Sequence, residues 1–424
     1  MKIALMTNNY KPIIGGVPIS IERLKGELER LGHQVTVFAP TYENQEEEPG
    51  VFRYATLRKD IMGGIVLPNP FDRRIEQEFR KQKFDIIHVH HPMLIGKTAV
   101  HLAKKYHIPL VFTYHTRYEQ YLCYVKPIQF LEKRALKGKR LSRMLLSYIQ
   151  EKTVPSYLRS FIRHCDYVLA PTEGLREYLH NTCHVEYDKL GLLPTGLDSQ
   201  SFSASEEEAG RVREKYQAEK IPLLLSVSRM AHEKNILFLL ESIARLKALY
   251  QKPFRVLLAG DGPDREAYEH RLAALNLTEE VVFVGEVENS RLAPYFKAAD
   301  AFIFTSKTET QGIVILEAFA GGTPVYALDA TGVRDLVKEG VNGYLSPENV
   351  DSYASILLNL LNGKDNAKVL SAGALNTARD YKEESVAINA IRLYNRIIAV
   401  HKEKTVSEDK GLYGKQISYF GSGR

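Results

Sequence analysis

The sequence is poor in the residues that build disulfide frameworks and paired-cysteine metal sites. It has only three cysteines, Cys123, Cys165 and Cys183, and they are widely spaced. An odd number of distant cysteines excludes a disulfide-stapled fold and a Cys-x-x-Cys metal motif. The reducing cytoplasm is the compartment that suits such a chain.

Long apolar segments are absent as well. The run from Ile221 to Val227 is among the longest, and it already contains Pro222 and Ser226. A membrane-spanning helix needs about 20 apolar residues, so no span is predicted. The apolar stretch after Met1 is too short for the core of a signal peptide, and we expect no export.

The composition is that of a globular protein with room for two domains. Of the 424 residues, 44% are hydrophobic and 25% are charged, which excludes a disordered or collagen-like chain. Short apolar runs alternate with longer amphipathic ones, as in parallel sheets joined by helices. Expected strands begin at Lys2, Gln34, Phe84, Pro109, Asp166, Pro222, Phe254, Val281, Ala301 and Thr323.

This strand pattern pauses near residue 200 and then restarts. A turn-rich segment at 191–198 is followed by a polar, charged stretch. We predict an α/β fold with an N-terminal Rossmann-like domain over 1–200 and a second one over 201–380. A final helix over 381–404 is expected to pack back toward the first domain, followed by a loose polar tail over 405–424. Ligands are expected at the carboxyl ends of the strands, in a central cleft between the two doubly wound domains.

Positive charge is concentrated in the first half of the chain. The net charge is +6, but residues 1–200 carry +8 and the rest −2. The segment from Lys126 to Arg163 alone carries +8, with apolar residues interleaved. Such a stretch suits an anionic surface, either lipid headgroups or nucleic acid, or it is a solvated helix pair with its apolar side in the core. No nucleic-acid motif accompanies it, so we expect no nucleic-acid partner. The basic residues predicted to meet a membrane are Lys126, Lys133, Arg134, Lys137, Lys139, Arg140 and Arg143.

The loops of the first half offer weaker signals. Gly15 and Gly16 precede a helix, where backbone N–H groups can approach a phosphate or a sugar closely. The loop is not Gly-x-Gly-x-x-Gly, which removes the main support for a nicotinamide-dependent enzyme. His88, His90 and His91 are interpreted as a polar strand end rather than a metal site. His115 ends the next strand and could hydrogen-bond a substrate or relay a proton.

The loops of the second half are more specific. Arg229 and Lys234 follow a strand and suit a diphosphate. Gly260 lies in a tight loop after the next strand, and Glu309 lies in the loop after a later one. Gln311, Gly312 and Ile313 begin a helix whose free N–H groups can hold phosphate oxygens, and Glu317 lies further along it.

These residues, in this order, resemble the family-4 retaining glycosyltransferases of the GT-B fold. The likeness covers the Gly15-Gly16 loop, His115, the SRMAHEKN segment from Ser228, and the pair Glu309 and Glu317. The string YHTRYEQY from Tyr114, followed by the basic segment, is similar to that of bacterial diacylglycerol glucosyl- and galactosyltransferases. The resemblance covers nearly the whole chain.

The resemblance implies a role for each matching residue. Arg229 and Lys234 would bind the donor diphosphate, and Gly15 and Gly16 would line the donor phosphates and the reacting centre. His115 would contact the donor sugar near the reacting carbon. Glu309 and the backbone after it would hold the sugar hydroxyls, and Glu317 the ribose. The implied donor site comprises Gly15, Gly16, Arg229, Lys234, Gly260, Glu309, Thr310, Gln311, Gly312, Ile313 and Glu317, with the base near 284–287.

A chemical expectation follows from what these residues can do. A nucleotide diphosphate is a good leaving group that needs positive charge more than a protein acid. No Asp-x-Asp motif occurs, so we expect transfer without a metal or other cofactor; retention of configuration is implied by the resemblance alone. The expected enzyme moves glucose or galactose from a UDP-sugar to diacylglycerol, from the cytoplasm, as a peripheral protein on the inner face of the membrane. Phosphatidylinositol, a soluble molecule or a glycan precursor remains an alternative acceptor, and a non-catalytic sugar-nucleotide binder remains an alternative class.

Overall fold

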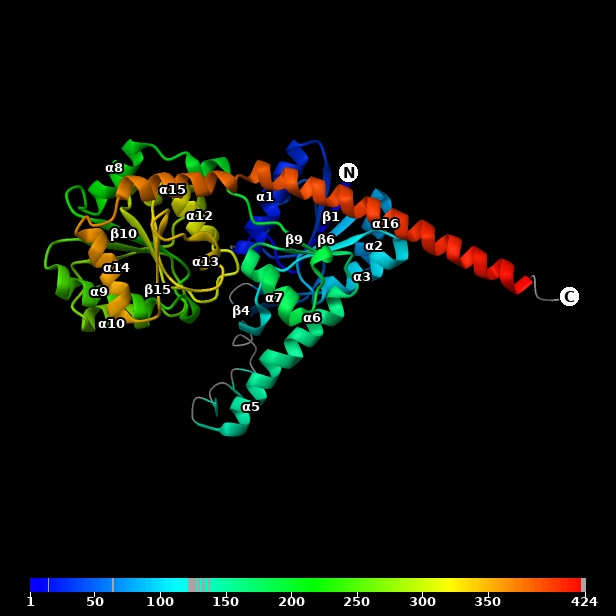
Figure 1. Cartoon of the computed structure of the whole chain (residues 1–424), viewed down its shortest axis with the longest axis horizontal. Coiled ribbons are helices and arrows are strands. Elements are labelled where there is room, and N and C mark those ends of the chain that lie inside the picture. The colour runs from blue at the N-terminus through cyan, green and yellow to red at the C-terminus, as the bar shows by residue number, and fades with distance from the viewer. Residues whose placement is uncertain are drawn as a thin grey trace. The chain divides into compact units, whose positions relative to one another are not determined.

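The computed structural model describes residues 1–13, 15–62, 65–120, 128, 130–131, 134–135 and 138–420, with the backbone alone described at 59–62, 65, 120 and 406–420. The chain forms two compact units (Figure 1). Unit 1 contains Met1–Pro194 and Val386–Arg424, and unit 2 contains Thr195–Ser385. The division therefore falls at Pro194 instead of residue 200, and the chain returns to unit 1 at Val386.

Unit 1 is built on a seven-stranded parallel sheet in the order β3-β2-β1-β6-β7-β8-β9. Strands buried on both faces have continuous apolar sequences, which is why the short apolar runs become strands here. β3 and β9, which the sequence pattern did not predict, lie at the two edges of the sheet. The strands are β1 (Lys2–Met6), β2 (Gln34–Pro40), β3 (Val51–Tyr54), β6 (Ile86–Val89), β7 (Leu110–Thr113), β8 (Tyr167–Ala170) and β9 (Leu190–Leu192).

Helices cover both faces of this sheet. Ile3 and Leu5 of β1 share one buried cluster with α1 (Gly16–Arg30) and α16 (Glu383–Phe420), whereas Ala4 and Met6 share another with the remaining helices. This alternation follows from the two-residue period of a strand. The helices of the second face are α2 (Arg73–Gln82), α3 (Ile95–Tyr106), α6 (Val154–Ile162) and α7 (Glu173–Cys183).

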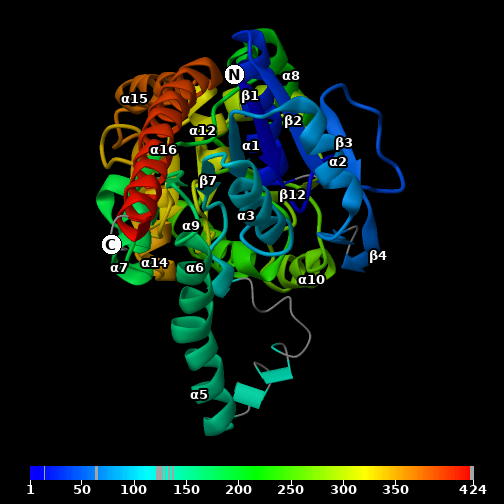
Figure 2. The same ribbon diagram turned by 90° about the vertical axis from the view of Figure 1, so that its right-hand side faces the viewer.

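Three further elements of unit 1 lie outside the sheet layers. β4 (Thr56–Met62) and β5 (Ile65–Pro68) form an antiparallel hairpin. α5 (Arg140–Tyr148) continues through a π-helix (Ile149–Thr153) into α6 and points away from the sheet (Figure 2). Among the described residues, no helix has the length and apolar content that crossing a membrane requires.

Unit 2 has a six-stranded parallel sheet in the order β12-β11-β10-β13-β14-β15. Two buried clusters, one on each face, fill the space between the sheet and its helices. The strands are β10 (Leu223–Val227), β11 (Arg255–Ala259), β12 (Val281–Gly285), β13 (Ala301–Phe304), β14 (Val325–Leu328) and β15 (Gly343–Ser346). The helices are α8 (Glu206–Lys215), α9 (Ile236–Tyr250), α10 (Arg265–Ala274), α11 (Ala293–Ala298), α12 (Ile313–Ala320), α13 (Val333–Leu336), α14 (Val350–Leu361) and α15 (Ala367–Asp380).

The two parallel, doubly wound sheets confirm the predicted fold class, but one local prediction was wrong. The charged stretch after residue 200 was given no secondary structure from the sequence, and Ser205 and Glu208 form a capping box there that begins α8. The backbone of α16 remains helical to Phe420, where a loose tail was predicted from residue 405. No proline interrupts that last stretch, so nothing in it breaks the helical hydrogen-bond ladder.

Candidate active site

The predicted diphosphate-binding cations of unit 2 are already paired with carboxylates. The Lys234 Nζ lies 2.6 Å from Glu309 Oε1, and the two side chains are 19% and 16% exposed. Thr305 after β13 donates to the Lys234 carbonyl, at 3.1 Å, and so joins the loops that carry the two partners. The ion pair therefore links the loops after β10 and β13, and neither charge is buried without a partner.

Arg229 forms a similar pair with a residue that the sequence reasoning did not assign. Its Nη2 lies 2.6 Å from Glu233 Oε1, and the arginine side chain is 53% exposed. The guanidinium carries five N–H donors in a planar fork, a geometry that suits the oxygens of a phosphate. Glu233 orients Arg229 from within the same loop.

Gly260 is required by the close packing of two loops. Its φ of +129° is a conformation that residues with side chains rarely adopt, and a Cβ there would overlap the carbonyl oxygen of Ser228. The backbone after β11 thus lies directly against the backbone after β10, at Ser228, the residue that precedes Arg229. Gly260 holds the loops of the site together through its lack of a side chain.

The helix α12 begins two residues later than predicted. Its first residue is Ile313 instead of Gln311, and Gly312 is its N-cap at φ +75°. Glycine has no side chain with which to cap a helix, so the first N–H groups of α12 remain suited to an anionic ligand. The side chain of Gln311 is used inside unit 2: its Oε1 accepts from the Thr195 N–H at 2.7 Å, and its Nε2 donates to the Thr195 carbonyl at 3.0 Å.

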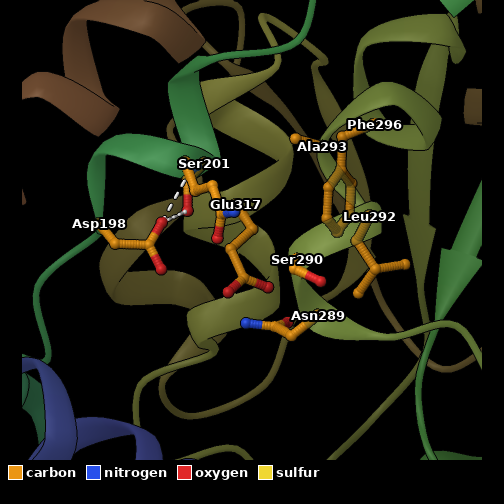
Figure 3. A pocket seen from close by; sticks show the side chains of 9 residues that line it. Asp198, Ser201, Asn289, Ser290, Leu292, Ala293, Phe296 and Glu317 are labelled. Atoms are coloured by element: carbon orange, nitrogen blue, oxygen red, sulfur yellow. Dashed lines mark hydrogen bonds between the residues drawn. The ribbon is translucent and has the colours of Figure 1, made fainter. Parts of the chain in front are cut away.

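Glu317 lines a pocket within unit 2. Figure 3 shows its carboxylate pointing into the space between Ser201 and the pair Asn289 and Ser290. Ser201 is held by Asp198, whose Oδ1 accepts from both its N–H and its hydroxyl at 2.8 Å. The sequence reasoning missed these four polar neighbours of Glu317, because they come from segments far apart in the chain.

In the first loop of unit 1, packing does not explain why residue 15 is a glycine. Gly15 is the N-cap of α1, and its φ of 172° is extended backbone that any residue adopts. A Cβ there would meet only Pro18 Cδ, at 3.8 Å. Nothing in the described part of the chain therefore requires glycine at this position, and the space beside it is open. Gly16 begins α1 directly behind it.

Four histidines lie at or near the carboxyl edge of the sheet of unit 1. His88 is fully buried, with its Nδ1 2.6 Å from the Tyr394 hydroxyl of α16 and its Nε2 2.6 Å from the Thr113 hydroxyl. His90 Nδ1 lies 2.8 Å from His115 Nε2. His91 Nδ1 accepts from the backbone N–H of Asn8, at 3.2 Å, which leaves its proton on Nε2.

Burial keeps these imidazoles neutral. It lowers the pKa of His88 to about 3 and that of His91 to about 4, and it holds the pKa of His90 and His115 well below the usual range. Within the described ranges, no group of three or more His, Cys, Asp or Glu side chains has a metal-binding arrangement. In this structure the imidazoles bond to hydroxyl groups, to a backbone N–H and to one another.

Buried polar atoms without a hydrogen-bond partner mark the same edges of both sheets. In the part of the chain that the structure describes, five side chains have such an atom, and each of them lies within five residues after the carboxyl end of a parallel strand. Leaving a buried polar atom unpaired costs about 1–3 kcal/mol, so such atoms call for a functional explanation. The five are Asn9, Tyr42, His90, Tyr118 and Thr308.

The basic segment of unit 1 divides into a buried part and an exposed part. Leu158, Phe161 and Ile162 of α6 are core residues, whereas Leu141 and Tyr148 of α5 are 79% and 62% exposed. Arg134, Lys139, Arg140 and Arg143 have no carboxylate partner among the described residues. Lys126, Lys133 and Lys137 lie outside the described residues. The helix-pair interpretation therefore holds for α6 alone.

Comparison with known families agrees with this architecture. Residues 14–201 match the model described as "Glycosyltransferase Family 4", and residues 210–377 match "Glycosyl transferases group 1". The chain belongs to this family of GT-B glycosyltransferases and is a hexosyltransferase.

Similar proteins include two alpha-monoglucosyldiacylglycerol synthases. That of Streptococcus pneumoniae is 32% identical over 84% of this chain and 78% of its own length. That of Acholeplasma laidlawii is 27% identical over 95% and 99%. Among solved structures, Anabaena Alr3699/HepE in complex with UDP has a TM-score of 0.71 and 17% identity, covering 93% of this chain and all of its own.

Proposed function

We propose that this enzyme transfers glucose or galactose from a UDP-sugar to 1,2-diacylglycerol in a membrane. The proposal is supported mainly by the surface of α5, where the exposed apolar side chains of Leu141 and Tyr148 lie beside Arg140 and Arg143. Glycolipid synthesis is also the activity in the names of both relatives above, and UDP is the ligand of the structural neighbour.

The donor would bind mainly to unit 2. Arg229, Lys234 and the first N–H groups of α12 supply positive charge for a diphosphate. The same charge would stabilise the nucleoside diphosphate as it leaves, which lowers the barrier without a protein acid. Because Lys234 and Glu309 are paired in the free enzyme, an arriving diphosphate would share Lys234, and Glu309 could then turn toward the sugar hydroxyls.

The remaining donor contacts follow from position. Glu317 would accept hydrogen bonds from the ribose in the pocket of Figure 3, and the base would lie near 284–287. The open space at Gly15 would admit a phosphate or the sugar, and His115 would contact the sugar. The proposed reaction keeps the configuration of the anomeric carbon through attack on the leaving-group face, and the departing phosphate takes the acceptor's proton. It needs no metal, because the cations of unit 2 take the place of one.

The lipid acceptor stays in the bilayer, so the enzyme has to reach it there. Each basic side chain close to an anionic membrane contributes about 1 kcal/mol to binding, and exposed apolar side chains add to this when they insert. Arg140 and Arg143 alternate with Leu141 and Met144 on α5. Reversible peripheral binding to the inner, cytoplasmic face of the membrane would result.

The test is UDP release by the purified enzyme from UDP-glucose and from UDP-galactose, with and without diacylglycerol in anionic vesicles. We expect release to depend on the vesicle-borne lipid, to survive chelation of divalent cations, and to vanish in Glu309→Ala. The better donor identifies the sugar. Slow release that is indifferent to diacylglycerol would overturn the acceptor assignment and would favour phosphatidylinositol or a soluble acceptor.

A further inference from the structure

His90 lies directly behind His115 in unit 1. The strands β6 and β7 pair in parallel, with Val89 opposite Phe112, so the residues that follow them leave the sheet at the same edge. The His90 Nδ1 and His115 Nε2 are 2.8 Å apart, and the rings stack with their centroids 5.1 Å apart. His90 is 1% exposed, whereas His115 is only partly buried. The His90 imidazole is thus enclosed, whereas the His115 imidazole keeps part of its surface exposed.

A hydrogen bond between two neutral imidazoles requires one ring to donate and the other to accept. Burial lowers the pKa of both rings well below the usual range, so each ring holds one proton at neutral pH. Two arrangements satisfy the 2.8 Å contact. Either His90 donates from Nδ1, or His115 donates from Nε2.

The second nitrogen of His90 distinguishes the two arrangements. His90 Nε2 is buried and has no partner among the residues that the structure describes. If His90 accepted at Nδ1, its only proton would sit on Nε2 as a buried donor without an acceptor. Buried donors without acceptors are rarer in proteins than buried acceptors without donors. Donation from His90 Nδ1 to His115 Nε2 is therefore the favoured arrangement.

We propose that His90 is a positioning residue that holds the proton of His115 on Nδ1. Within the described part of the chain, this outer nitrogen has no protein partner. A neutral imidazole with its proton on Nδ1 donates a hydrogen bond there and takes up no proton at that atom. His115 then acts as a hydrogen-bond donor to an oxygen of the substrate, such as a hydroxyl of the transferred sugar, and does not act as a general base. The inference rests on the proposed function, because it assumes that His115 meets the donor sugar.

The protonation state can be measured without substrate. In the full-length enzyme with ¹⁵N-labelled histidine, the ¹⁵N shifts distinguish a protonated ring nitrogen from an unprotonated one, and the loss of signals in His115→Gln and His90→Asn assigns them. We expect the proton of His115 on Nδ1 and a bare Nε2. A proton on His115 Nε2 would overturn the proposal. Since this measurement needs no turnover, a failure of the proposed lipid glycosylation would leave its result intact.

Two substitutions separate the donor role from packing. His90→Asn places an amide N–H near the position of Nδ1, whereas His90→Leu removes the donor. We expect His90→Leu to lower kcat for the sugar nucleotide about tenfold or more with KM changed less than about twofold. The figure is by analogy with metal sites, where loss of the partner that orients a ligating histidine costs about 10–100-fold. His90→Asn should keep kcat within about threefold of the wild type.

The matched control is His88→Leu. This neighbour is equally buried, and its ring centroid lies 4.3 Å from that of His90, but it makes no bond to His115. It should cost comparable stability while kcat stays within about threefold. If His90→Asn and His90→Leu lose kcat equally, or if His88→Leu loses as much as His90→Leu, packing explains the effect and the proposal is wrong.

Discussion

The strand ends of the two units are held in place by different forces. In unit 2, Lys234 is paired with Glu309 and Arg229 with Glu233, and Gly260 brings one loop backbone against another. In unit 1, the corresponding edge carries two neutral imidazoles, His90 and His115, joined to each other, and a Cβ at Gly15 would meet only Pro18 among the described residues. Charge organises the site of unit 2, and neutral hydrogen bonds organise that of unit 1.

The difference matches the ligand chemistry proposed for each unit. A diphosphate is anionic, so its site needs cations, and these must have carboxylate partners when the ligand is away. A sugar hydroxyl is neutral, so a neutral N–H donor serves it without the cost of burying a charge. Among the described residues, Arg140 and Arg143 of α5 have no carboxylate partner, and an anionic surface is the partner proposed for them.

The largest effect is expected at the ion pair of unit 2. Lys234→Ala should lower kcat/KM for the UDP-sugar by about 10²–10³, because it removes a cation from the leaving group and leaves Glu309 without its partner. Lys307→Ala is the matched control, since Lys307 pairs with Glu348 and is 49% exposed. A Lys234→Ala enzyme within about threefold of the wild type would remove the charge argument for unit 2.

The two glycines provide the next contrast. Gly260→Ala should destabilise the protein by about 3 kcal/mol, because a Cβ would overlap the Ser228 carbonyl. Gly15→Ala should change the free energy of unfolding by less than about 0.5 kcal/mol. It should still reduce turnover, because the added methyl group would occupy space proposed for the donor substrate. Urea unfolding and the UDP-release assay separate the two outcomes, and equal stability losses at both positions would contradict this distinction.

Membrane binding should depend on unit 1 alone. The double change Arg140→Gln with Arg143→Gln removes two cations worth about 1 kcal/mol each, so affinity for anionic vesicles should fall about 30-fold in a co-sedimentation assay. Arg211→Gln with Arg245→Gln makes the same change in charge on unit 2, at side chains that are 70% and 48% exposed. Equal losses in both double variants would mean a general charge effect and no specific role for α5.

The smallest expected effect is a pH dependence of stability that originates in unit 1. Burial lowers the pKa of His88 to about 3, so below pH 6.5 the unfolded chain binds a proton there that the folded chain does not. Stability should fall as the pH falls from 6 to 5, by about 1.4 kcal/mol for this group. In His88→Leu, the free energy of unfolding measured with urea should fall by that much less between pH 6 and pH 5.

Much of the fold and part of the site were predictable from local patterns. The ten expected strands all formed, and the loops that follow them carry the predicted Arg229, Lys234, Glu309 and His115. This works because a buried parallel strand leaves a continuous apolar run, and because ligands meet such sheets at the carboxyl ends. The start of α8 was missed, since a charged capping box has the same composition as a solvated linker.

The sequence by itself determined the α/β class, the strand-end positions of the candidate site residues and the concentration of positive charge from Lys126 to Arg163. Only the tertiary structure decided the partners: Lys234 with Glu309, Gln311 with Thr195, His90 with His115, and His88 with Tyr394, 306 residues away. The reason is physical. A strand's apolar run says that it will be buried but not which strand lies beside it, and the order of strands in a parallel sheet decides which loops meet.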